Sequence, residues 1–250
     1  MTEKTKQDIT ISVISHNQKN LVESLLKSLE KQNTQRISKI IITSNTNENL
    51  DFKKFCISEK IILIKNKKIK GFGENHNNAF KQCSTKFFCI LNPDIIFKSD
   101  VFDILVDTLI QNKLSLVSPL VTNEVGQIED NSRFFPTPFH LLKKFFSEKS
   151  GVYKSKEDIF FPDWIGGMFM LFDSSVYNDL EGFDESYFLY YEDVDICLRA
   201  WKKNFKVGCY SKVSVIHNAR RSSRKKLNYL IHHLKSIFMF YYKHLGRFPR

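Results

Sequence analysis

The chain has 250 residues, 42% of them hydrophobic, which is enough for one large globular domain or two small ones. Its formal net charge of +11 predicts an anionic partner, such as nucleic acid, a phosphorylated small molecule or an acidic membrane surface. Scattered cysteines without zinc-like spacing, a polar N-terminus and the lack of a long apolar run predict a cytoplasmic chain, soluble or peripheral, without disulfides or a membrane span.

The first half of the chain alternates predicted strands with predicted helices. Residues 9–15 are β-branched and indicate a strand, and Asn20 is a candidate N-cap for a helix with leucines at helical spacing. Further strands are expected at 38–43, 61–64, 87–91 and 114–121, with helices at 74–83 and 100–109. This alternation predicts an α/β fold whose mostly parallel sheet has helices on both faces.

Polar residues stand where the predicted strands end. They are Ser15, His16, Asn17, Thr43, Ser44, Asn45, Asn66, Asn92 and Asp94. In parallel sheets the carboxyl ends of the strands meet at one edge, and ligands bind there. We therefore expect these side chains to share an edge.

The pattern changes after residue 122. A polar connection at 122–138 is followed by a short amphipathic helix at 140–146 and a loop-like stretch at 151–163. Gly166 and Gly167 precede an apolar strand at 168–172, and paired glycines there indicate close approach of a ligand or a neighbouring element. Two short strands are expected at 206–209 and 213–216, just before His217.

The stretch 182–199, GFDESYFLYYEDVDICLR, carries most of the predicted chemistry. Aromatic residues lead into Glu192, Asp193 and Asp195, and a helical pattern follows. Acids at a helix start suit the helix dipole, and this alone explains many such clusters. The large rings before them would also wall off part of a pocket, where a carboxylate has a raised pKa and can act as a base.

Six motifs in order resemble the family 2 inverting glycosyltransferases with the GT-A fold, especially their rhamnosyltransferase-like branch. They are ISVISHN, GFGENHNNAF, LNPDI, DWIGGMFMLF, GFDESYFLYYEDVDICLR and VIHNARRSS, and they cover about residues 9–223. The resemblance implies a GT-A domain at 1–222, with a donor-binding half at about 1–121 and an acceptor-binding half at about 122–222. It also implies transfer of a sugar, such as L-rhamnose from dTDP-L-rhamnose, to a glycan or polyprenyl-diphosphate-linked acceptor in cell-surface polysaccharide biosynthesis.

The resemblance assigns catalytic and metal-binding roles. Asp193 would be the general base, with Glu192 orienting it or the acceptor, and Asp195 a structural acid at the helix start. Asp94, with Asn92 and His217, would hold Mg²⁺ or Mn²⁺ in place of the usual DxD motif, because oxygen ligands suit these ions. An Asn-Pro-Asp sequence is also a common turn, and a lone histidine at a strand end is more often a packing residue.

Substrate contacts follow from the same resemblance. Donor binding is assigned to Ser15, His16, Asn17, Thr43, Ser44, Asn77, Asn92, Asp94, Arg220 and Arg221, and acceptor binding to Trp164, Gly166 and Gly167. The two arginines would hold the diphosphate, although a solvated basic run is the alternative. Relatives often end the second strand with an acid that contacts the nucleotide, and residues 43–45 contain none, so the nucleotide preference stays open.

The C-terminal residues 223–250 predict a basic amphipathic helix. Its apolar face would carry Leu227, Leu230, Ile231, Leu234, Phe238 and Tyr241, flanked by Lys226, Lys235 and Lys243. Such a helix can lie on an anionic membrane, here the inner face of the plasma membrane. It can equally close its own domain or a homodimer.

Three other functions have less support in the sequence. A nucleotidyltransferase would need a GxGxxxR-like phosphate loop near the first strand, which the sequence lacks. A nucleic-acid-binding protein would interleave basic and exposed aromatic residues on one surface, whereas acids gather at the predicted sheet edge. A catalytically inactive sugar-binding relative would not be expected to retain both Asp94 and Asp193.

Overall fold

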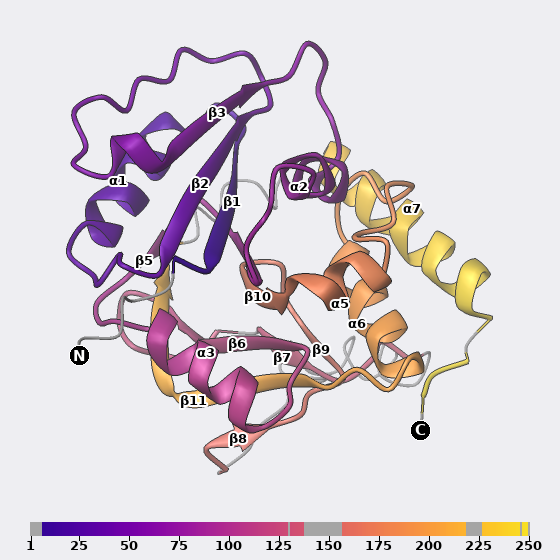
Figure 1. Cartoon of the computed structure of the whole chain (residues 1–250). Helices are drawn as coiled ribbons and strands as arrows, with labels where there is room; N and C mark the ends of the chain where they lie inside the picture. Colours follow the sequence, from indigo (N-terminus) through magenta and orange to yellow (C-terminus); the bar gives the residue numbers. More distant parts are fainter. Residues whose placement is uncertain (1–6, 130, 138–156, 219–226, 246, 250) are drawn as a thin grey trace.

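The sheet of the protein is built mainly from parallel strands and is covered on both faces by helices (Figure 1). The structure, a computed structural model, describes residues 7–129, 131–137, 157–218, 227–245 and 247–249. Within these described residues the sheet has nine strands in the order β3-β2-β1-β4-β10-β6-β11-β5, and β8 pairs with β11 outside this path. A second sheet consists of β7 and β9.

The first half contains the strands β1 (Ile9–Ser15), β2 (Ile37–Ser44), β3 (Ile61–Lys65), β4 (Phe87–Leu91), β5 (Ile95–Ile96) and β6 (Leu116–Thr122). Its helices are α1 (Lys19–Leu29), α2 (Phe72–Phe80) and α3 (Phe102–Gln111), with a 3-10 turn η1 (Ser58–Lys60). Strands β1 to β4 pair in parallel, as the alternation of elements predicts.

The second half contains the strands β7 (Ser132–Arg133), β8 (Ile159–Phe160), β9 (Trp164–Ile165), β10 (Phe169–Asp173) and β11 (Val207–His217). Its helices are α5 (Ser174–Asp179), α6 (Glu192–Lys202) and α7 (Leu227–His244). Strand β10 runs antiparallel to both neighbours, β4 and β6, and so interrupts the parallel order at the centre of the sheet.

The burial of β4 explains why the core lies on both sides of the sheet. All five of its residues are buried and apolar, and successive side chains of a strand point to opposite faces. Cys89 and Leu91 join the cluster formed with α1 and α3, whereas Phe88 and Ile90 pack with α5 and α6. The α/β architecture expected from the sequence, a sheet with helices on both faces, is confirmed.

Several boundaries differ from the sequence-based expectation. Helix α1 begins at Lys19 after Gln18, so Asn20 lies inside it rather than at its N-cap. The two strands expected at 206–209 and 213–216 are one strand, β11, whose pairing with β6 shifts register between Tyr210 and Ser214. A bulge of this kind breaks the sequence pattern without ending the strand. The helix expected at 140–146 lies outside the described residues.

Helix α7 packs against the loop before α6. Phe240 is fully buried in a cluster with Tyr187, Tyr191 and Leu198. Ser236 donates a hydrogen bond from its Oγ to the Leu189 carbonyl oxygen at 2.9 Å. Within the part of the chain that the structure describes, no helix combines the length and apolar character needed to cross a bilayer.

Candidate active site

Helix α6 begins directly after two residues in left-handed backbone geometry. Tyr190 has φ 71° and Tyr191 has φ 69°. Bulky residues rarely adopt this conformation, and surrounding packing must hold them there. The Tyr191 ring packs against the rings of Phe240 and His233, with centroids 5.4 and 5.6 Å away. The sharp turn ends the aromatic loop and starts the helix at Glu192.

The Asp193 carboxylate is fixed by two backbone amides. Gly167 donates to its Oδ2 at 3.1 Å, and Val194 donates to its Oδ1 at 2.9 Å. Burial raises the pKa of Asp193, while these two amides and the positive charge of Arg133 offset part of the rise. The group is thus a partly buried carboxylate with a raised pKa, which suits a general base.

A side chain at Gly167 would crowd the Phe72 ring, which would have to move by a few tenths of an ångström. A Cβ at this position would lie 3.1 Å from the Phe72 ring and 3.9 Å from the Asp193 Cβ. Both glycines therefore lie close to neighbouring protein elements. The neighbour of Gly166 is Asn131, whose Oδ1 would be 2.9 Å from an added Cβ.

Glu192 and Asp195 occupy different surroundings from Asp193. Glu192 is buried, and its Oε2 makes no hydrogen bond with the described residues. Burial, followed by the charges of Asp193 and Asp195, raises the pKa of Glu192 well above 4.5. Asp195 accepts hydrogen bonds from Arg199 at 2.7 Å and His244 at 2.8 Å. Asp195 therefore joins α6 to α7, whereas the Glu192 carboxyl group is buried beside Asp193.

A second group of polar residues lies at the carboxyl end of β4. The Asp94 Oδ2 is 3.3 Å from the His217 Nε2, and the His217 Nδ1 donates to the Glu129 Oε2 at 2.6 Å. Burial alone would lower the pKa of His217, but Asp94 and Glu129 outweigh it and raise the pKa. The structure thus brings together Asp94 and His217, which are far apart in the sequence, and adds Glu129.

The group at the end of β4 fits part of a metal site. Among the described residues, no cluster of three or more His, Cys, Asp or Glu side chains is arranged to hold a metal ion. The Asp94 Oδ1, however, is buried and has no hydrogen-bond partner among the described residues. One carboxylate and one imidazole leave most ligand positions of Mg²⁺ or Mn²⁺ to phosphate oxygens and water, as is usual for these ions on nucleotides. The residues present fit a metal held jointly with a diphosphate.

The surroundings of Asp193 and the Asp94–His217 group are joined through the backbone of Gly167 and Met168. The Asn92 amide donates to the Met168 carbonyl oxygen at 3.0 Å, and the neighbouring Gly167 amide binds Asp193. The end of β4 and the start of α6 are therefore joined through two consecutive residues just before β10. This contact places the Asp193 carboxylate near the segment that carries Asn92 and Asp94.

The first two strands end side by side, as predicted. The Asn45 amide donates to the Ser15 carbonyl oxygen at 2.8 Å. Ser15, Thr43 and Ser44 are fully buried, and the Ser15 and Thr43 hydroxyls have no hydrogen-bond partner among the described residues. His16, by contrast, is exposed.

A network of side-chain amides fixes the end of β3 to the same edge. The Asn66 Nδ2 donates to the Asn45 Oδ1 at 2.8 Å and to the Asn75 Oδ1 at 2.6 Å. Asn45 also accepts a hydrogen bond from the Lys70 amide at 2.9 Å. The loop between β3 and α2 is thereby held against the strand ends.

An acid does lie at this edge, although residues 43–45 contain none. The Glu48 Oε1 accepts a hydrogen bond from the Asn17 amide at 3.0 Å. The two residues line a hollow of about 260 Å³ together with the start of α1. Glu48 was missed because it follows the strand end by four residues, in a loop without a pattern.

Two predicted contact residues have side chains engaged within the protein. The Asn77 Oδ1 accepts from Tyr177 at 2.7 Å and from the Phe183 amide at 2.9 Å, and its Nδ2 donates to the Phe183 carbonyl at 2.8 Å. Trp164 donates to the Phe134 carbonyl at 3.0 Å, and the Arg133 guanidinium lies 5.7 Å from its ring centroid. Asn77 acts as a structural anchor in this geometry.

Glu129, Asn131 and Arg133 were missed by sequence reasoning. All three lie in the polar connection at 122–138, whose two-residue strand β7 is too short to show a periodic pattern. Arg220 and Arg221, predicted to hold the diphosphate, lie outside the described residues.

Comparison with known proteins identifies the class of this enzyme. Residues 10–175 match the model of the family "Glycosyl transferase family 2". The chain belongs to this family and is a glycosyltransferase, which confirms the resemblance seen in its motifs.

Three proteins illustrate the similarity. Rhamnosyltransferase WbbL of Escherichia coli (strain K12) is 28% identical over 247 residues, covering 93% of this chain and 92% of that protein. An N-acetylglucosaminyl-diphospho-decaprenol L-rhamnosyltransferase of Mycobacterium tuberculosis is 24% identical, covering 70% of this chain and 61% of that protein. The solved structure of the mannosyltransferase PcManGT from Pyrobaculum calidifontis, in complex with GDP-Man and Mn²⁺, aligns with a TM-score of 0.66 at 14% identity. That alignment covers 97% of this chain and 66% of PcManGT.

Proposed function

We propose that this enzyme transfers a sugar, with inversion, from a nucleotide-diphospho-sugar to a hydroxyl group of a glycan or polyprenyl-diphosphate-linked acceptor in surface polysaccharide assembly. L-rhamnose from dTDP-L-rhamnose is the donor we favour, because two relatives are named as rhamnosyltransferases. The observation that carries the proposal is the meeting of the Asp193 and Asp94 groups at Gly167 and Met168.

In the proposed reaction Asp193 removes the proton from the acceptor hydroxyl. The acceptor oxygen forms a bond to the anomeric carbon of the donor while the bond from that carbon to the diphosphate oxygen breaks. The nucleoside diphosphate leaves with the electron pair, and one displacement inverts the configuration. Gly167 and Val194 hold the carboxylate by its two oxygens, so its position is fixed before the acceptor binds.

Glu192 contributes to the base in an indirect way. It is buried next to Asp193, and burial and the charge of Asp193 raise the pKa of Glu192, whereas three backbone amides and Arg133 offset part of the rise in the pKa of Asp193. Two adjacent carboxylates that share one proton separate into an acid and a base. We assign Glu192 to positioning of Asp193 and of the acceptor.

A divalent cation held by Asp94 and His217, with Asn92 beside it, would neutralise the negative charge of the leaving diphosphate. Glu129 would keep the Nε2 of His217 turned toward Asp94, because it accepts the proton of the Nδ1. Mn²⁺ is the ion named with the donor in PcManGT. Arg220 and Arg221 remain proposed contacts of the diphosphate.

The nucleotide would lie along the ends of β1 and β2. Ser15 and Thr43 have buried hydroxyls without partners among the described residues, and His16 and Asn17 are exposed beside them. Glu48 supplies a carboxylate at this edge, in the hollow next to Asn17. The acceptor would approach from the side of Gly167 and Trp164.

A thermal-shift screen tests the proposal. Donor at about 100 times its Kd stabilises the folded state by about 2.7 kcal/mol, or roughly 5–10 °C in Tm for a chain of this size. We expect dTDP-L-rhamnose with Mn²⁺ to raise the Tm by this amount, EDTA to remove most of the rise, and Asp94→Asn to reduce it. The exposed Asp158→Asn variant is the control.

The possible results separate the parts of the proposal. A donor-induced rise in Tm that persists in EDTA would support the proposed glycosyltransferase function but contradict the proposed metal site. A rise in Tm with another nucleotide sugar, and not with dTDP-L-rhamnose, would identify that nucleotide sugar as the donor. If no nucleotide sugar raises the Tm while oligonucleotides do, the proposed function is wrong.

A further inference from the structure

Helix α7 carries a row of exposed apolar side chains. Leu234, Phe238 and Tyr242 follow one another at four-residue spacing and are 57%, 75% and 72% exposed. Leu230 extends the row by one more four-residue step and is 54% exposed, and Leu245, which directly follows the helix, is 71% exposed. Four-residue steps place side chains on one side of a helix, so Leu230, Leu234, Phe238 and Tyr242 form a continuous outer row.

The opposite side of α7 is packed, so the outer row is not needed to hold the helix in place. Phe240 and Ser236 are buried against the loop before α6. Tyr241, which the sequence assigned to the same apolar face as Leu234 and Phe238, instead donates a hydrogen bond to the Pro136 carbonyl. The position on the outer face is taken by Tyr242.

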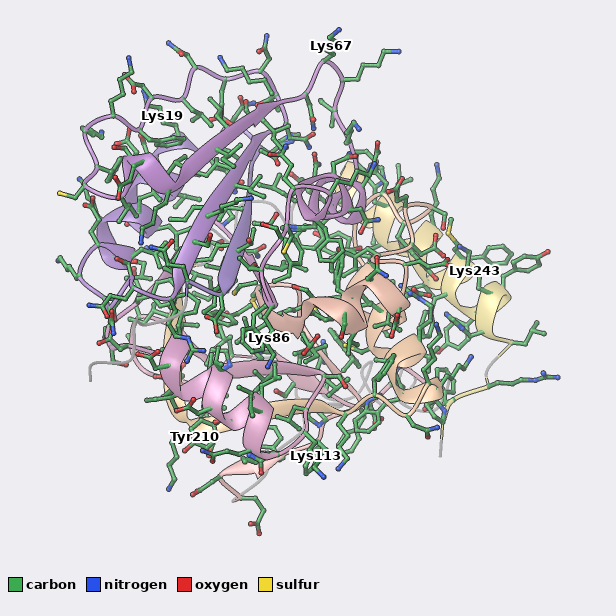
Figure 2. All side chains as sticks on the ribbon, in the orientation of Figure 1. Lys19, Lys67, Lys86, Lys113, Tyr210 and Lys243 are labelled. Carbon is green, nitrogen blue, oxygen red and sulfur yellow. The ribbon has the colours of Figure 1, made fainter. Side chains whose placement is uncertain are left out.

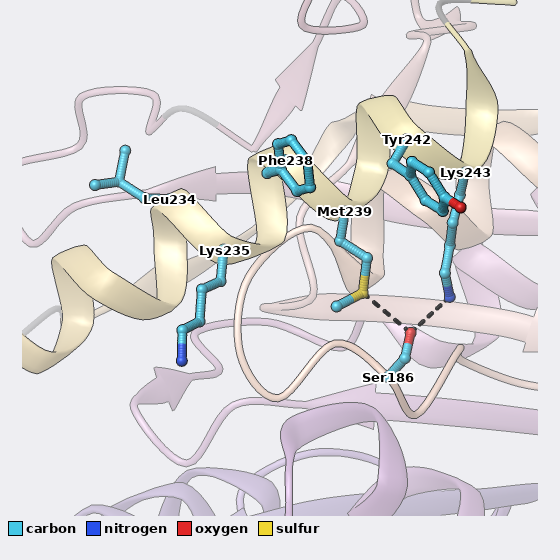
Figure 3. Close-up of a pocket in the computed structure, with 7 residues that line it drawn as sticks. All are labelled: Ser186, Leu234, Lys235, Phe238, Met239, Tyr242 and Lys243. Atoms are coloured by element: carbon cyan, nitrogen blue, oxygen red, sulfur yellow. Dashed lines mark hydrogen bonds between the residues drawn. The ribbon is translucent and has the colours of Figure 1, made fainter.

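A groove runs beside the outer row. It has a volume of about 690 Å³ and lies between α7 and Ser186 (Figure 3). Phe238 and Tyr242 stand on one side, and Lys235, Met239 and Lys243 line the other. Apolar walls with amines at the rim suit a ligand that has both hydrocarbon and negative charge.

The formal charge of α7 is positive. The helix contains Lys235 and Lys243 and no acidic residue. Lys243 is paired with Asp184, while Lys235 is exposed and forms no ion pair among the described residues. In the sequence, the basic run at 220–226 directly precedes α7.

We infer that the outer row of α7 docks on an anionic lipid bilayer, with its apolar side chains in the headgroup region and Lys235 at the phosphates. The apolar side chains of the outer row would insert into the headgroup region, and the lysines would attract the helix to anionic lipid headgroups. A second copy of the chain fits less well, because two such faces would bring equal charges together on proteins of net charge +11. This inference does not rest on the proposed function, since lipid binding needs no sugar donor.

Vesicle co-sedimentation of the full chain tests the inference. We expect binding to vesicles of phosphatidylcholine with about one-third phosphatidylglycerol, and little binding to phosphatidylcholine alone. The double substitution Phe238→Ser with Tyr242→Ser should lower the partition coefficient about tenfold or more. Lys235→Glu should lower binding to the anionic vesicles only.

The matched control is Ile104→Ser with Ile110→Ser on α3, where the two side chains are 41% and 49% exposed. This variant should bind vesicles like the wild type, and circular dichroism should show that all variants are folded. Equal binding of wild type and the α7 double variant would overturn the inference. So would a dimer in sedimentation velocity that the α7 substitutions dissociate, if no vesicle binding accompanies it.

Discussion

Glu192 and Asp193 are neighbours in the chain, but their carboxylates have different roles in the structure. Asp193 is held by the amides of Gly167 and Val194, whereas one oxygen of Glu192 has no partner among the described residues. The amides favour the charged form of Asp193, and burial favours the neutral form of Glu192. The two substitutions that remove these charges should therefore have different effects.

Asp193→Asn should lower kcat/KM by roughly 10²–10⁴, because the amide cannot accept the acceptor proton. Glu192→Gln should stay within about tenfold of wild type, because the amide resembles the protonated acid that it replaces. The measurement is release of nucleoside diphosphate from the donor in the presence of acceptor. Donor-induced thermal shifts in both variants serve as the control for binding.

Equal losses in the two variants would contradict this division of roles and would indicate that Glu192 acts in its ionised form. Unchanged turnover in Asp193→Asn would remove Asp193 as the base.

The stability of the protein should depend on pH through Glu192. Above pH 4.5 this group ionises in the unfolded chain, while burial and the charge of Asp193 keep it protonated in the folded state, where its pKa is raised. The free energy of unfolding therefore falls as pH rises from 4.5 toward the raised pKa of Glu192. The glutamine of the Glu192→Gln variant cannot ionise, so the stability of this variant does not fall for this reason.

We expect the Tm of Glu192→Gln to exceed that of wild type by an amount that grows between pH 5 and pH 8. Calorimetry or circular dichroism can measure it, with the exposed Glu124→Gln as the matched control. A difference that stays constant over this range would show that Glu192 has an ordinary pKa in the folded protein.

At the scale of elements, the turn after α5 sets the path of the aromatic loop. Gly182 has φ +66°, and a Cβ there would lie 2.3 Å from the Asn77 Oδ1. The Arg199 side chain donates to the Gly182 carbonyl at 2.8 Å and so joins this turn to α6. The turn thus couples α2, α5 and α6 through one backbone position.

Gly182→Ala should destabilise the protein by roughly 1–3 kcal/mol from backbone strain, with a further loss from the contact with Asn77. Gly126→Ala is a matched control, because Gly126 has φ +78° but nothing lies within 4 Å of its added Cβ. The difference in urea unfolding free energy between the two variants measures the cost of the contact. Equal values would mean that the Asn77 side chain moves aside freely.

The elements that the sequence predicted well are those with long hydrophobic runs. Strands β1 and β4 were located to the residue, because each is bounded by polar or turn-forming residues. The two-residue strands β5, β7, β8 and β9 were not predicted, since pairing across the fold, not local sequence, creates them. Helix α5 was also missed, although Asp173 accepts a hydrogen bond from the Ser175 amide at its start.

In the candidate site, too, contacts that depend on the tertiary structure could not be predicted from the local sequence. The motif resemblance assigns Asp94 and His217 to one site, and in the structure the Asp94 Oδ2 lies 3.3 Å from the His217 Nε2. Glu129 was not found, because its role depends on a loop folding back on His217 from a stretch without periodicity. Asn77 matched a motif, but its amide is taken up by Tyr177 and Phe183, which only the tertiary structure reveals.

At the scale of the whole molecule, positive charge is spread over many elements. Figure 2 shows Lys19, Lys67, Lys86, Lys113 and Lys243 at well-separated places on the described surface. A net charge of +11 distributed in this way raises solubility and attraction to anionic surfaces in general. Specific binding must come from the local arrangements at the strand ends and on α7.

The sheet joins the donor-binding and acceptor-binding halves proposed from the sequence. Strand β10, from the second half, pairs with both β4 and β6 of the first half. A fragment that ends at residue 126 would therefore leave one edge of β4 and both edges of β6 without the strands that pair with them, and we expect it to aggregate. Size-exclusion chromatography of this fragment beside the full chain is the measurement, and a monomer that unfolds cooperatively would contradict the expectation.

The position of β10 in the sequence also affects how the protein folds during its synthesis on the ribosome. Strands β1 to β4 can pair as soon as they emerge, but the sheet cannot close until residue 173 has left the exit tunnel. Until then, the hydrophobic edges of β4 and β6 are open to other nascent chains. We expect this interval to be when a chaperone is most needed, and substitutions that weaken β10 to reduce yield in cells more than they reduce the activity of the molecules that do fold.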